Sequence, residues 1–339
     1  MLEEINQKLK RGAELSAGEA TDAMRLIMGG RCSEDEIVEF LSALSAKGET
    51  AREIAAFARV MRENCNGMEL EFETIDTCGT GGDEIKTFNI STACAFVLAG
   101  GGLKVAKHGN RAFTSKAGSA DVLEALGVKV NLEKEKTAEC VRRIGIGFLF
   151  APLFHPAMKN VASARKRIGK RTVFNLLGPL TNPFGARRQV LGVYEEKLVE
   201  KMGAVLNELG CVHGFVVHGV KGLDEASVIG ETVFCEVKNG KTEMGKFSPE
   251  EFGITKSYAK EEILGGDAKE NAQIIKNIFE GKERGAKREM VVVNSALGFA
   301  AGGIAGDVKE GAKIAGKIID EGKAMRKLEE LKVLTNELS

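Results

Sequence analysis

From about Leu70, short β-rich runs alternate with helical patterns and glycine-rich turns, and the last third of the chain continues with long helical segments. This alternation is typical of a mostly parallel sheet covered by helices. The candidate strands are 74–77, 103–106, 146–150, 189–193 and 215–218. The candidate helices are 91–99, 120–126, 134–144, 198–209, 268–279 and 308–321. We therefore expect an α/β fold whose ligand-binding turns lie at the carboxyl ends of the strands.

The residues before this alternating region predict a separate helical lobe. Three apolar-periodic segments each begin with a capping box, in which Ser or Thr is followed three residues later by Glu. These boxes are Ser16 with Glu19, Ser33 with Glu36, and Thr50 with Glu53, and the stops are Gly29-Gly30, Gly48 and Asn66-Gly67. The clearest joint falls near Gly67, so we expect a helical domain at 1–67 and an α/β domain at 68–339.

Composition excludes several classes of function. The 48 basic residues balance the 48 acidic residues, so the chain has no overall field for nucleic acid or an anionic membrane. No signal peptide or membrane-spanning run is evident, and seven cysteines without a C-x-x-C pair argue against a disulfide framework and a structural zinc site. We expect a cytosolic protein with reduced thiols, in which any anion site is local.

Residues 76–83, Asp-Thr-Cys-Gly-Thr-Gly-Gly-Asp, form a glycine-rich turn directly after a predicted strand. Such a turn exposes backbone N–H groups to a phosphate. Glu84 replaces the glycine that a dinucleotide fingerprint needs, and a P-loop lysine is missing. On glycine spacing alone, a simple tight turn is an equally good interpretation.

Further polar segments follow this turn at the next predicted junctions. They are TFNIST at 87–92, KHGNR at 107–111 and SKAGS at 115–119. The first opens a helix, whose N-terminal N–H groups favour phosphate oxygens, although hydroxyls there also serve as ordinary caps. Together, these segments predict a pocket for a highly anionic ligand.

Two charged segments could complete that pocket. Asp224-Glu225 offers oxygen ligands that suit Mg²⁺ shared with substrate phosphates, although the pair taken alone is more simply an exposed dipeptide. The run from Arg165 to Arg171 carries five positive charges. A solvated helix face is the simple interpretation, and we favour one arginine turned inward to hold a carboxylate.

These motifs resemble those of the anthranilate phosphoribosyltransferases of tryptophan biosynthesis. The resemblance covers most of the chain, and the blocks occur in the family's order. They lie at 76–83, 87–92, 107–111, 118–127, 155–161, 171–183 and 222–227. The resemblance implies a nucleoside phosphorylase/phosphoribosyltransferase-like fold, with a small N-terminal helical domain, joined by a helical segment near 156–185, and a larger domain with a mostly parallel central sheet. It also implies a homodimer formed through the helical lobes.

The resemblance further implies the substrates and the residues that bind them. The substrates would be phosphoribosyl diphosphate and anthranilate, with Mg²⁺ as cofactor, two ions per subunit. Substrate contacts would come from Gly79, Gly82, Asp83, Thr87, Asn89, Ile90, Ser91, Thr92, Lys107, His108, Gly109, Asn110, Arg111, Ser115, Ser119, Arg165 and Pro179. Catalysis would rest on Lys107, Asn110 and Arg165, and the metal ligands would be Ser91, Asp224 and Glu225.

Three positions depart from the family pattern. Glu84 follows the glycine turn, Ala112-Phe113-Thr114 replaces a smaller and more polar stretch, and Lys221 stands where an acid is common. Two rival functions stay open. A pyrimidine nucleoside phosphorylase shares the architecture, but the acid pair and the amide in KHGNR favour the transferase. A non-catalytic nucleic-acid binder is disfavoured because the chain is neutral and retains the glycine turn.

Overall fold

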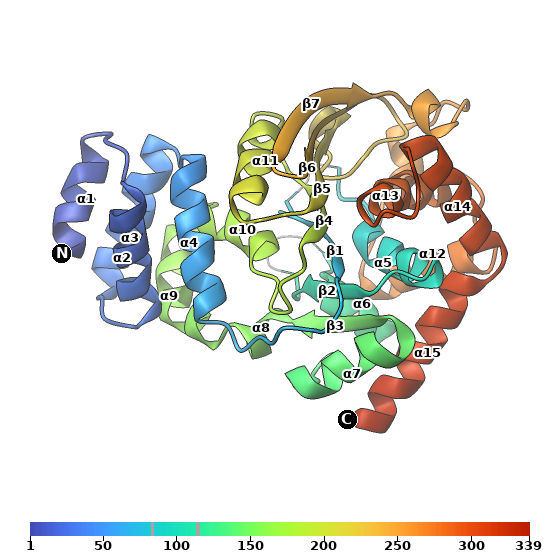
Figure 1. The fold of residues 1–339 in the computed structure, drawn as a ribbon, viewed down its shortest axis with the longest axis horizontal. Helices are drawn as coiled ribbons and strands as arrows, with labels where there is room; N and C mark the ends of the chain where they lie inside the picture. The colour runs from blue at the N-terminus through green and yellow to red at the C-terminus, as the bar shows by residue number, and fades with distance from the viewer. Residues whose placement is uncertain (83–84, 113–115) are drawn as a thin grey trace.

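A computed structural model describes residues 1–82, 85–112 and 116–339 of the chain. Its N-terminal part is a bundle of four helices, seen at the left of Figure 1. They are α1 (Leu2–Lys10), α2 (Ala17–Met28), α3 (Glu34–Lys47) and α4 (Ala51–Glu63). A later helix, α9 (Lys159–Ile168), packs against α2 and α3. The bundle is therefore extended by a segment about a hundred residues further along the chain.

All three predicted capping boxes are present. In each, the cap hydroxyl accepts the backbone N–H three residues later, and the glutamate accepts the backbone N–H of the cap. Gly29 and Gly48 end α2 and α3 as expected. The end of α4 differs, because Asn64 caps this helix before the predicted stop at Asn66-Gly67.

A seven-stranded sheet follows, with the strand order β3-β2-β1-β4-β5-β6-β7. The first five strands in sequence run parallel to one another, whereas β6 is antiparallel to β5 and β7 is antiparallel to β6. Their bounds are β1 (Ile75–Gly79), β2 (Val105–Gly109), β3 (Ile146–Phe150), β4 (Arg188–Gly192), β5 (His213–Gly219), β6 (Thr232–Lys238) and β7 (Lys241–Phe247). This confirms the mostly parallel sheet and its five predicted strands.

The antiparallel hairpin β6–β7 is an addition to the prediction, which assigned no strand to this region. Its turn consists of Asn239 and Gly240, both with positive φ (50° and 79°). An Asn-Gly pair of this kind is a strong hairpin signal, because both residues tolerate the left-handed backbone that a tight two-residue turn needs. The hairpin extends the sheet at the edge opposite β3.

Helices cover both faces of the sheet (Figure 1). The helix α11 (Leu198–Glu208) packs against β5 and β6 and also against α4, which joins the helical bundle to the sheet. The other covering and connecting helices are α5 (Ile90–Gly100), α6 (Ser119–Ala125), α7 (Lys134–Ile144), α8 (Ala151–Phe154), α10 (Val173–Leu177), α12 (Ala268–Phe279), α13 (Ala286–Ala301), α14 (Val308–Asp320) and α15 (Lys323–Leu338). Short 3₁₀ segments lie at 156–158, 178–180, 220–222, 249–252 and 260–263.

The apolar core lies on both sides of the sheet. One cluster gathers the side chains of α5 and α13 on one face, and a second is continuous from the helical bundle to α11 and the opposite face. All seven cysteines are free, and Cys78, Cys94, Cys140 and Cys235 are buried. Among the described residues, no helix is both long and apolar enough to cross a bilayer.

Candidate active site

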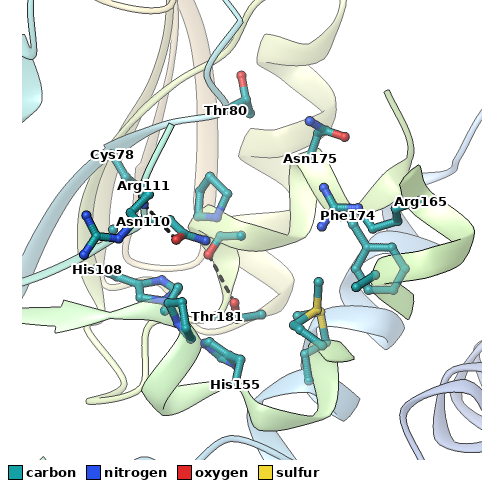
Figure 2. Close-up of a pocket in the computed structure, with 18 of the residues that line it drawn as sticks. Cys78, Thr80, His108, Asn110, Arg111, His155, Arg165, Phe174, Asn175 and Thr181 are labelled. Atoms are coloured by element: carbon teal, nitrogen blue, oxygen red, sulfur yellow. Dashed lines mark hydrogen bonds between the residues drawn. The ribbon is translucent and has the colours of Figure 1, made fainter. Parts of the chain in front are cut away.

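A cavity of about 560 Å³ lies at the carboxyl edge of the sheet, next to the helical bundle. The sheet contributes the ends of β1 and β2 to its wall, and α4, α9 and α10 contribute the facing wall. Figure 2 shows Arg165 and Phe174 on the side opposite His108 and Asn110. Among the predicted site residues, the cavity is lined by Gly79, His108, Gly109, Asn110, Arg111, Arg165 and Pro179. The glycine turn and the KHGNR segment therefore face the same space.

Two hydrogen bonds donated by backbone N–H groups hold the glycine turn after β1. The Thr80 N–H donates to the Gly192 carbonyl at 2.9 Å, and the Gly81 N–H donates to Asp224 Oδ2, also at 2.9 Å. Gly81 and Gly82 have positive φ values of 69° and 80°, which glycine adopts without steric cost. The turn thus runs directly beside one of the two predicted metal-binding acids.

Glycines at the strand ends allow the loop that carries Asp224 to approach the sheet edge. A Cβ atom on Gly79 would lie 2.6 Å from Asp224 Oδ2, and one on Gly192 would lie 1.5 Å from the Asp224 carbonyl oxygen. The same loop is fixed from behind, because the Asn294 side chain bonds both the N–H and the carbonyl of Ala226 at 2.8 and 2.9 Å. These contacts bring Asp224, from the loop after β5, to the ends of β1 and β4.

Glu225 follows Asp224 on the same loop and is close enough to two thiols to affect their pKa values. Burial raises the pKa of the Cys94 thiol, on the first turns of α5, and that of the Cys78 thiol, at the end of β1, because it disfavours the thiolate. The negative charge of Glu225 raises the pKa of both thiols further, and Asp76 acts on Cys78 in the same direction. Asp224 and Glu225 are each only 8% exposed, so neither is the exposed surface acid of the simpler interpretation.

Lys107 points from β2 toward the start of α5. Its Nζ donates to the Thr77 carbonyl at 2.6 Å and to Ser91 Oγ at 3.3 Å. This places an ammonium group beside the first turn of α5, where the helix dipole also favours an anion. Lys107 therefore approaches Ser91 rather than Asn110 and the cavity.

Asp76, on β1, holds the start of the KHGNR segment through a hydrogen bond. Its carboxylate accepts the His108 N–H at 3.2 Å and the Asn182 side-chain amide at 2.8 Å. Burial raises the pKa of Asp76 to about 6, and the nearby charge of Lys107 offsets part of this effect. The carboxylate thus ties β1, β2 and the loop after α10 together.

The start of α5 exposes little side-chain surface at two of the predicted positions. Ile90 is 1% exposed and packs in the core, and Thr92 is fully buried. The Asn89 amide donates to the Ala117 carbonyl at 3.2 Å and accepts from Asn271 at 2.9 Å. Asn89 therefore links α5 to a neighbouring loop in this structure.

The two residues that end KHGNR have different surroundings. Asn110 lines the cavity, and its carbonyl accepts the Ser119 hydroxyl at 3.3 Å. Arg111 also lines the cavity, but its guanidinium pairs with Glu124 at 2.6 Å and Asp121 at 3.1 Å. These two acids raise the pKa of Arg111, so its charge is already matched within the protein.

A pair of neutral histidines forms part of the cavity wall. The rings of His108 and His155 are 5.1 Å apart between centroids. Burial lowers the pKa of His108 to about 3 and that of His155 to about 4, so neither imidazole is charged at neutral pH. Both Nε2 atoms are buried without a hydrogen-bond partner among the described residues. The sequence-based prediction did not include His155 among the site residues, although the resemblance covered the block at 155–161 that begins with it.

The three arginines of the basic run at 165–171 have different contacts. Arg165, on α9, is half-buried, lines the cavity and lies 5.5 Å from the Phe174 ring centroid, and burial lowers its pKa. Arg167 turns away and pairs with Asp35 at 2.6 Å. Arg171 donates to the Gly82 carbonyl at 2.5 Å. Arg165 thus faces the cavity, as the inward-turning hypothesis requires.

The described residues contain no cluster of three or more His, Cys, Asp or Glu side chains that could hold a metal alone. Two carboxylates beside a glycine-rich turn instead fit Mg²⁺, which keeps waters and takes substrate phosphates as ligands. Lys221, one of the three departures, lies on the loop before these acids with a positive φ of 62°. Asp83, Glu84, Phe113, Thr114 and Ser115 lie outside the described residues.

The fold and this site define a two-domain glycosyl transferase, and comparison with known proteins agrees. The helical bundle domain of the glycosyl transferase family matches residues 3–65, and the a/b domain of the same family matches residues 71–325. An anthranilate phosphoribosyltransferase from Pelotomaculum thermopropionicum is 51% identical over 341 residues, which span 100% of this chain and 98% of the relative.

Solved structures of related proteins show the same architecture. The crystal structure of anthranilate phosphoribosyltransferase from Thermus thermophilus has a TM-score of 0.92 and 42% identity, covering 98% of this chain and 99% of that chain. The Saccharomyces cerevisiae enzyme in complex with PRPP and Mg has a TM-score of 0.91 and 30% identity, covering 99% and 98%. The same yeast enzyme in complex with 4-fluoroanthranilate has a TM-score of 0.89 and 28% identity over the same shares.

The chain belongs to the anthranilate phosphoribosyltransferases, the enzymes of tryptophan biosynthesis that transfer a phosphoribosyl group to anthranilate.

Proposed function

We propose that the active site is divided into a phosphate half and an acceptor half that meet at the carboxyl ends of β1 and β2. Phosphoribosyl diphosphate would bind the backbone of Gly79 and Gly82, the start of α5 and the ammonium of Lys107. The close approach of Lys107 to Ser91, at 3.3 Å, supports this assignment because it concentrates positive potential at the first turn of α5. Asp83, Ser115 and Ser119 would complete the phosphate contacts.

Anthranilate would occupy the cavity between KHGNR and α9. Its carboxylate would pair with Arg165, and its ring would lie among His108, His155 and Pro179. Three observations support this orientation: Arg165 lines the wall opposite Asn110, both imidazoles are neutral, and a yeast relative binds 4-fluoroanthranilate. Neutral rings facing a guanidinium favour a flat aromatic ligand that bears a carboxylate.

The reaction would be a displacement at ribose C1 with diphosphate as the leaving group. The aromatic amine already carries its lone pair at neutral pH, so the site needs no strong base to create a nucleophile. Lys107 and the N–H groups of the glycine turn would stabilise the charge that develops on the departing diphosphate. Arg165 and Asn110 would hold the amine against C1, so that positioning contributes more than proton transfer.

We propose two Mg²⁺ ions per subunit, held by Ser91, Asp224 and Glu225 together with diphosphate oxygens. When bound, Mg²⁺ neutralises negative charge on the diphosphate. The short contact between Asp224 and the Gly81 N–H supports a shared role of this acid and the glycine turn, and a yeast relative binds PRPP and Mg. Adjacent residues point in different directions, which suits one carboxylate for each ion.

Three further assignments belong to the same proposal. We place a homodimer interface on the helical lobe, a domain boundary near Gly67 and the enzyme in the cytosol. The boundary is supported by the end of α4 at Glu63 and the start of β1 at Ile75. Sedimentation or light scattering of the chain tests the dimer, and replacing exposed bundle residues should shift it to monomer.

The observation that carries the proposal is the convergence of the glycine turn, KHGNR and Asp224-Glu225 on one edge of the sheet. The direct test is the loss of anthranilate fluorescence after adding phosphoribosyl diphosphate and Mg²⁺. The double variant Asp224→Asn with Glu225→Gln should need far more Mg²⁺ for half-maximal rate. Equal activity of variant and native enzyme at low Mg²⁺ would exclude the metal role of these acids.

A further inference from the structure

The guanidinium of Arg171 lies between an aromatic ring and the glycine turn. Its Nη2 donates to the Gly82 carbonyl at 2.5 Å, and its Cζ lies 3.9 Å from the Tyr194 ring centroid. A Cβ atom on Gly82 would lie only 2.6 Å from Nη2. A stacked guanidinium is planar and restricted, so it presents its donors in a fixed direction. The contact therefore fixes the position of the Gly82 carbonyl.

Tyr194 is itself tied to the glycine turn. Its backbone N–H donates to Thr80 Oγ1 at 3.2 Å, while the Thr80 N–H donates to the Gly192 carbonyl at 2.9 Å. The segment after β4 thus supports the turn at Thr80 through its backbone and at Gly82 through the ring of Tyr194 and Arg171. Two supports on either side of Gly81 determine where the N–H groups of the turn point.

Arg171 also stands between two elements of the acceptor wall. It follows α9, which carries Arg165, and precedes α10, which carries Phe174. Phe174 and Arg165 both line the cavity and contact each other. The segment 165–174 consequently lines the cavity proposed for anthranilate and also contacts the glycine turn through Arg171.

We propose that Arg171, held by Tyr194, is a positioning residue that keeps the glycine turn in the conformation that receives the diphosphate group. This inference rests on the proposed binding of phosphoribosyl diphosphate at that turn. Arg171 acts through Gly82, and its own guanidinium is occupied by the carbonyl and the ring. Arg171 and Tyr194 then form one functional unit, and removing either disables the same support.

The test measures steady-state rates by anthranilate fluorescence, with each substrate varied in turn. Arg171→Ala should raise the KM for phosphoribosyl diphosphate about tenfold, the effect of losing one hydrogen bond from a charged donor. The KM for anthranilate should change less than about twofold, the range of an uninvolved position. Tyr194→Leu should raise the diphosphate substrate's KM about threefold, and Tyr194→Phe, which keeps the ring, should not.

The double variant decides whether the two residues act together. In the double variant Arg171→Ala with Tyr194→Leu, the KM for phosphoribosyl diphosphate should stay about tenfold above the native value, as in Arg171→Ala alone, because both substitutions remove the same contact. If the two residues acted independently, their effects on KM would multiply to about thirtyfold. Arg171→Lys keeps the charge but loses the planar stack, so it should fall between native and Ala. Lys170→Ala removes the adjacent exposed cation and is the matched control, and thermal melting checks that each variant is folded.

Several outcomes would overturn the inference. They are an unchanged KM in Arg171→Ala, an equal loss in Lys170→Ala, or a strong effect of Arg171→Ala with none from Tyr194→Leu. The last would mean that Arg171 binds the substrate without Tyr194. If the native enzyme consumed no anthranilate, the proposed function would fail and this inference with it. If the native enzyme turned over normally and the variants matched it, only this inference would fail.

Discussion

Gly192→Ala directly perturbs the loop that carries Asp224 and Glu225. Gly192 ends β4, and a Cβ atom there would lie 1.5 Å from the Asp224 carbonyl oxygen and 2.5 Å from its carbonyl carbon. Ordinary contact needs a separation of roughly 3.5 Å, so the loop must retreat by about 2 Å. The obstacle is backbone, so no side-chain rotation relieves it. Asn294 clamps Ala226 from the other side and resists this retreat.

The expected result is a folded but weakened enzyme with a disturbed acid pair. Overpacking of this kind costs about 1–3 kcal/mol of unfolding free energy. The retreat also carries Asp224 away from the Gly81 N–H, which it now accepts at 2.9 Å. We therefore expect the half-maximal Mg²⁺ concentration to rise about tenfold, as when one charge-assisted contact is lost. The assay is a Mg²⁺ titration of the anthranilate fluorescence decay, with thermal unfolding measured in parallel.

Gly18→Ala is the matched control, because a Cβ atom on Gly18 would meet nothing within 4 Å and the residue lies in α2. That variant should keep the native Mg²⁺ dependence and gain up to about 1 kcal/mol of stability from helix propensity. Native Mg²⁺ dependence in Gly192→Ala would refute the reasoning, since it would show that the position of Asp224 does not set the metal requirement.

Three further predictions concern the acceptor, the helical bundle and pH. Arg165→Ala should raise the KM for anthranilate by roughly tenfold to a hundredfold, because about 1.5–3 kcal/mol of charged contact is lost; kinetics with varied anthranilate measure it. Lys47→Met should lower the unfolding free energy by about 3–5 kcal/mol, measured by urea denaturation, because it leaves the fully buried Glu53 carboxylate without its cation. Since the pKa values of His108 and His155 are lowered to about 3 and 4, the unfolded chain binds more protons below pH 6.5, and stability falls as pH decreases toward 4. Replacing both histidines by Asn should reduce the change in unfolding free energy with pH by up to about 2–3 kcal/mol per pH unit. Urea denaturation at several pH values measures this change.

Each of these predictions has a control within the chain. Lys166→Ala changes an exposed neighbour of Arg165, and a normal KM for anthranilate is expected there. Arg25→Met breaks the exposed pair with Glu63 and should cost at most about 1 kcal/mol. A His218→Asn variant controls for loss of a histidine outside the cavity. Contrary results would be an unchanged KM in Arg165→Ala, equal losses in Lys47→Met and Arg25→Met, or a native pH slope in the double histidine variant.

Local signals in the sequence predicted much of the fold. The three capping boxes and the five parallel strands depend on residues close together in the chain, and all are present. The β6–β7 hairpin was missed although Asn239-Gly240 marks its turn, because charged and polar residues weaken the apolar alternation of its exposed second strand. Turn chemistry was the stronger signal there.

The site was predictable only in part. Glycine turns and strand-end polar residues predicted that the glycine turn and KHGNR lie at one edge of the sheet, because parallel strands bring their carboxyl ends together there. The neutral state of His108 and His155, the link from Asp76 to Asn182 and the stack of Arg171 on Tyr194 depend on burial and on contacts between distant segments. No local pattern encodes these contacts.

The cavity between the sheet edge and the helical bundle has a consequence for how such enzymes diversify. Met61 and Arg165 contribute to it from the bundle side, whereas the glycine turn and Lys107 belong to the sheet. With the substrates bound as we propose, a lineage can change the part of the cavity that contacts the aromatic amine while keeping the residues that bind the activated sugar. New acceptors become accessible by a few substitutions in α4 and α9, without rebuilding the chemistry at the strand ends.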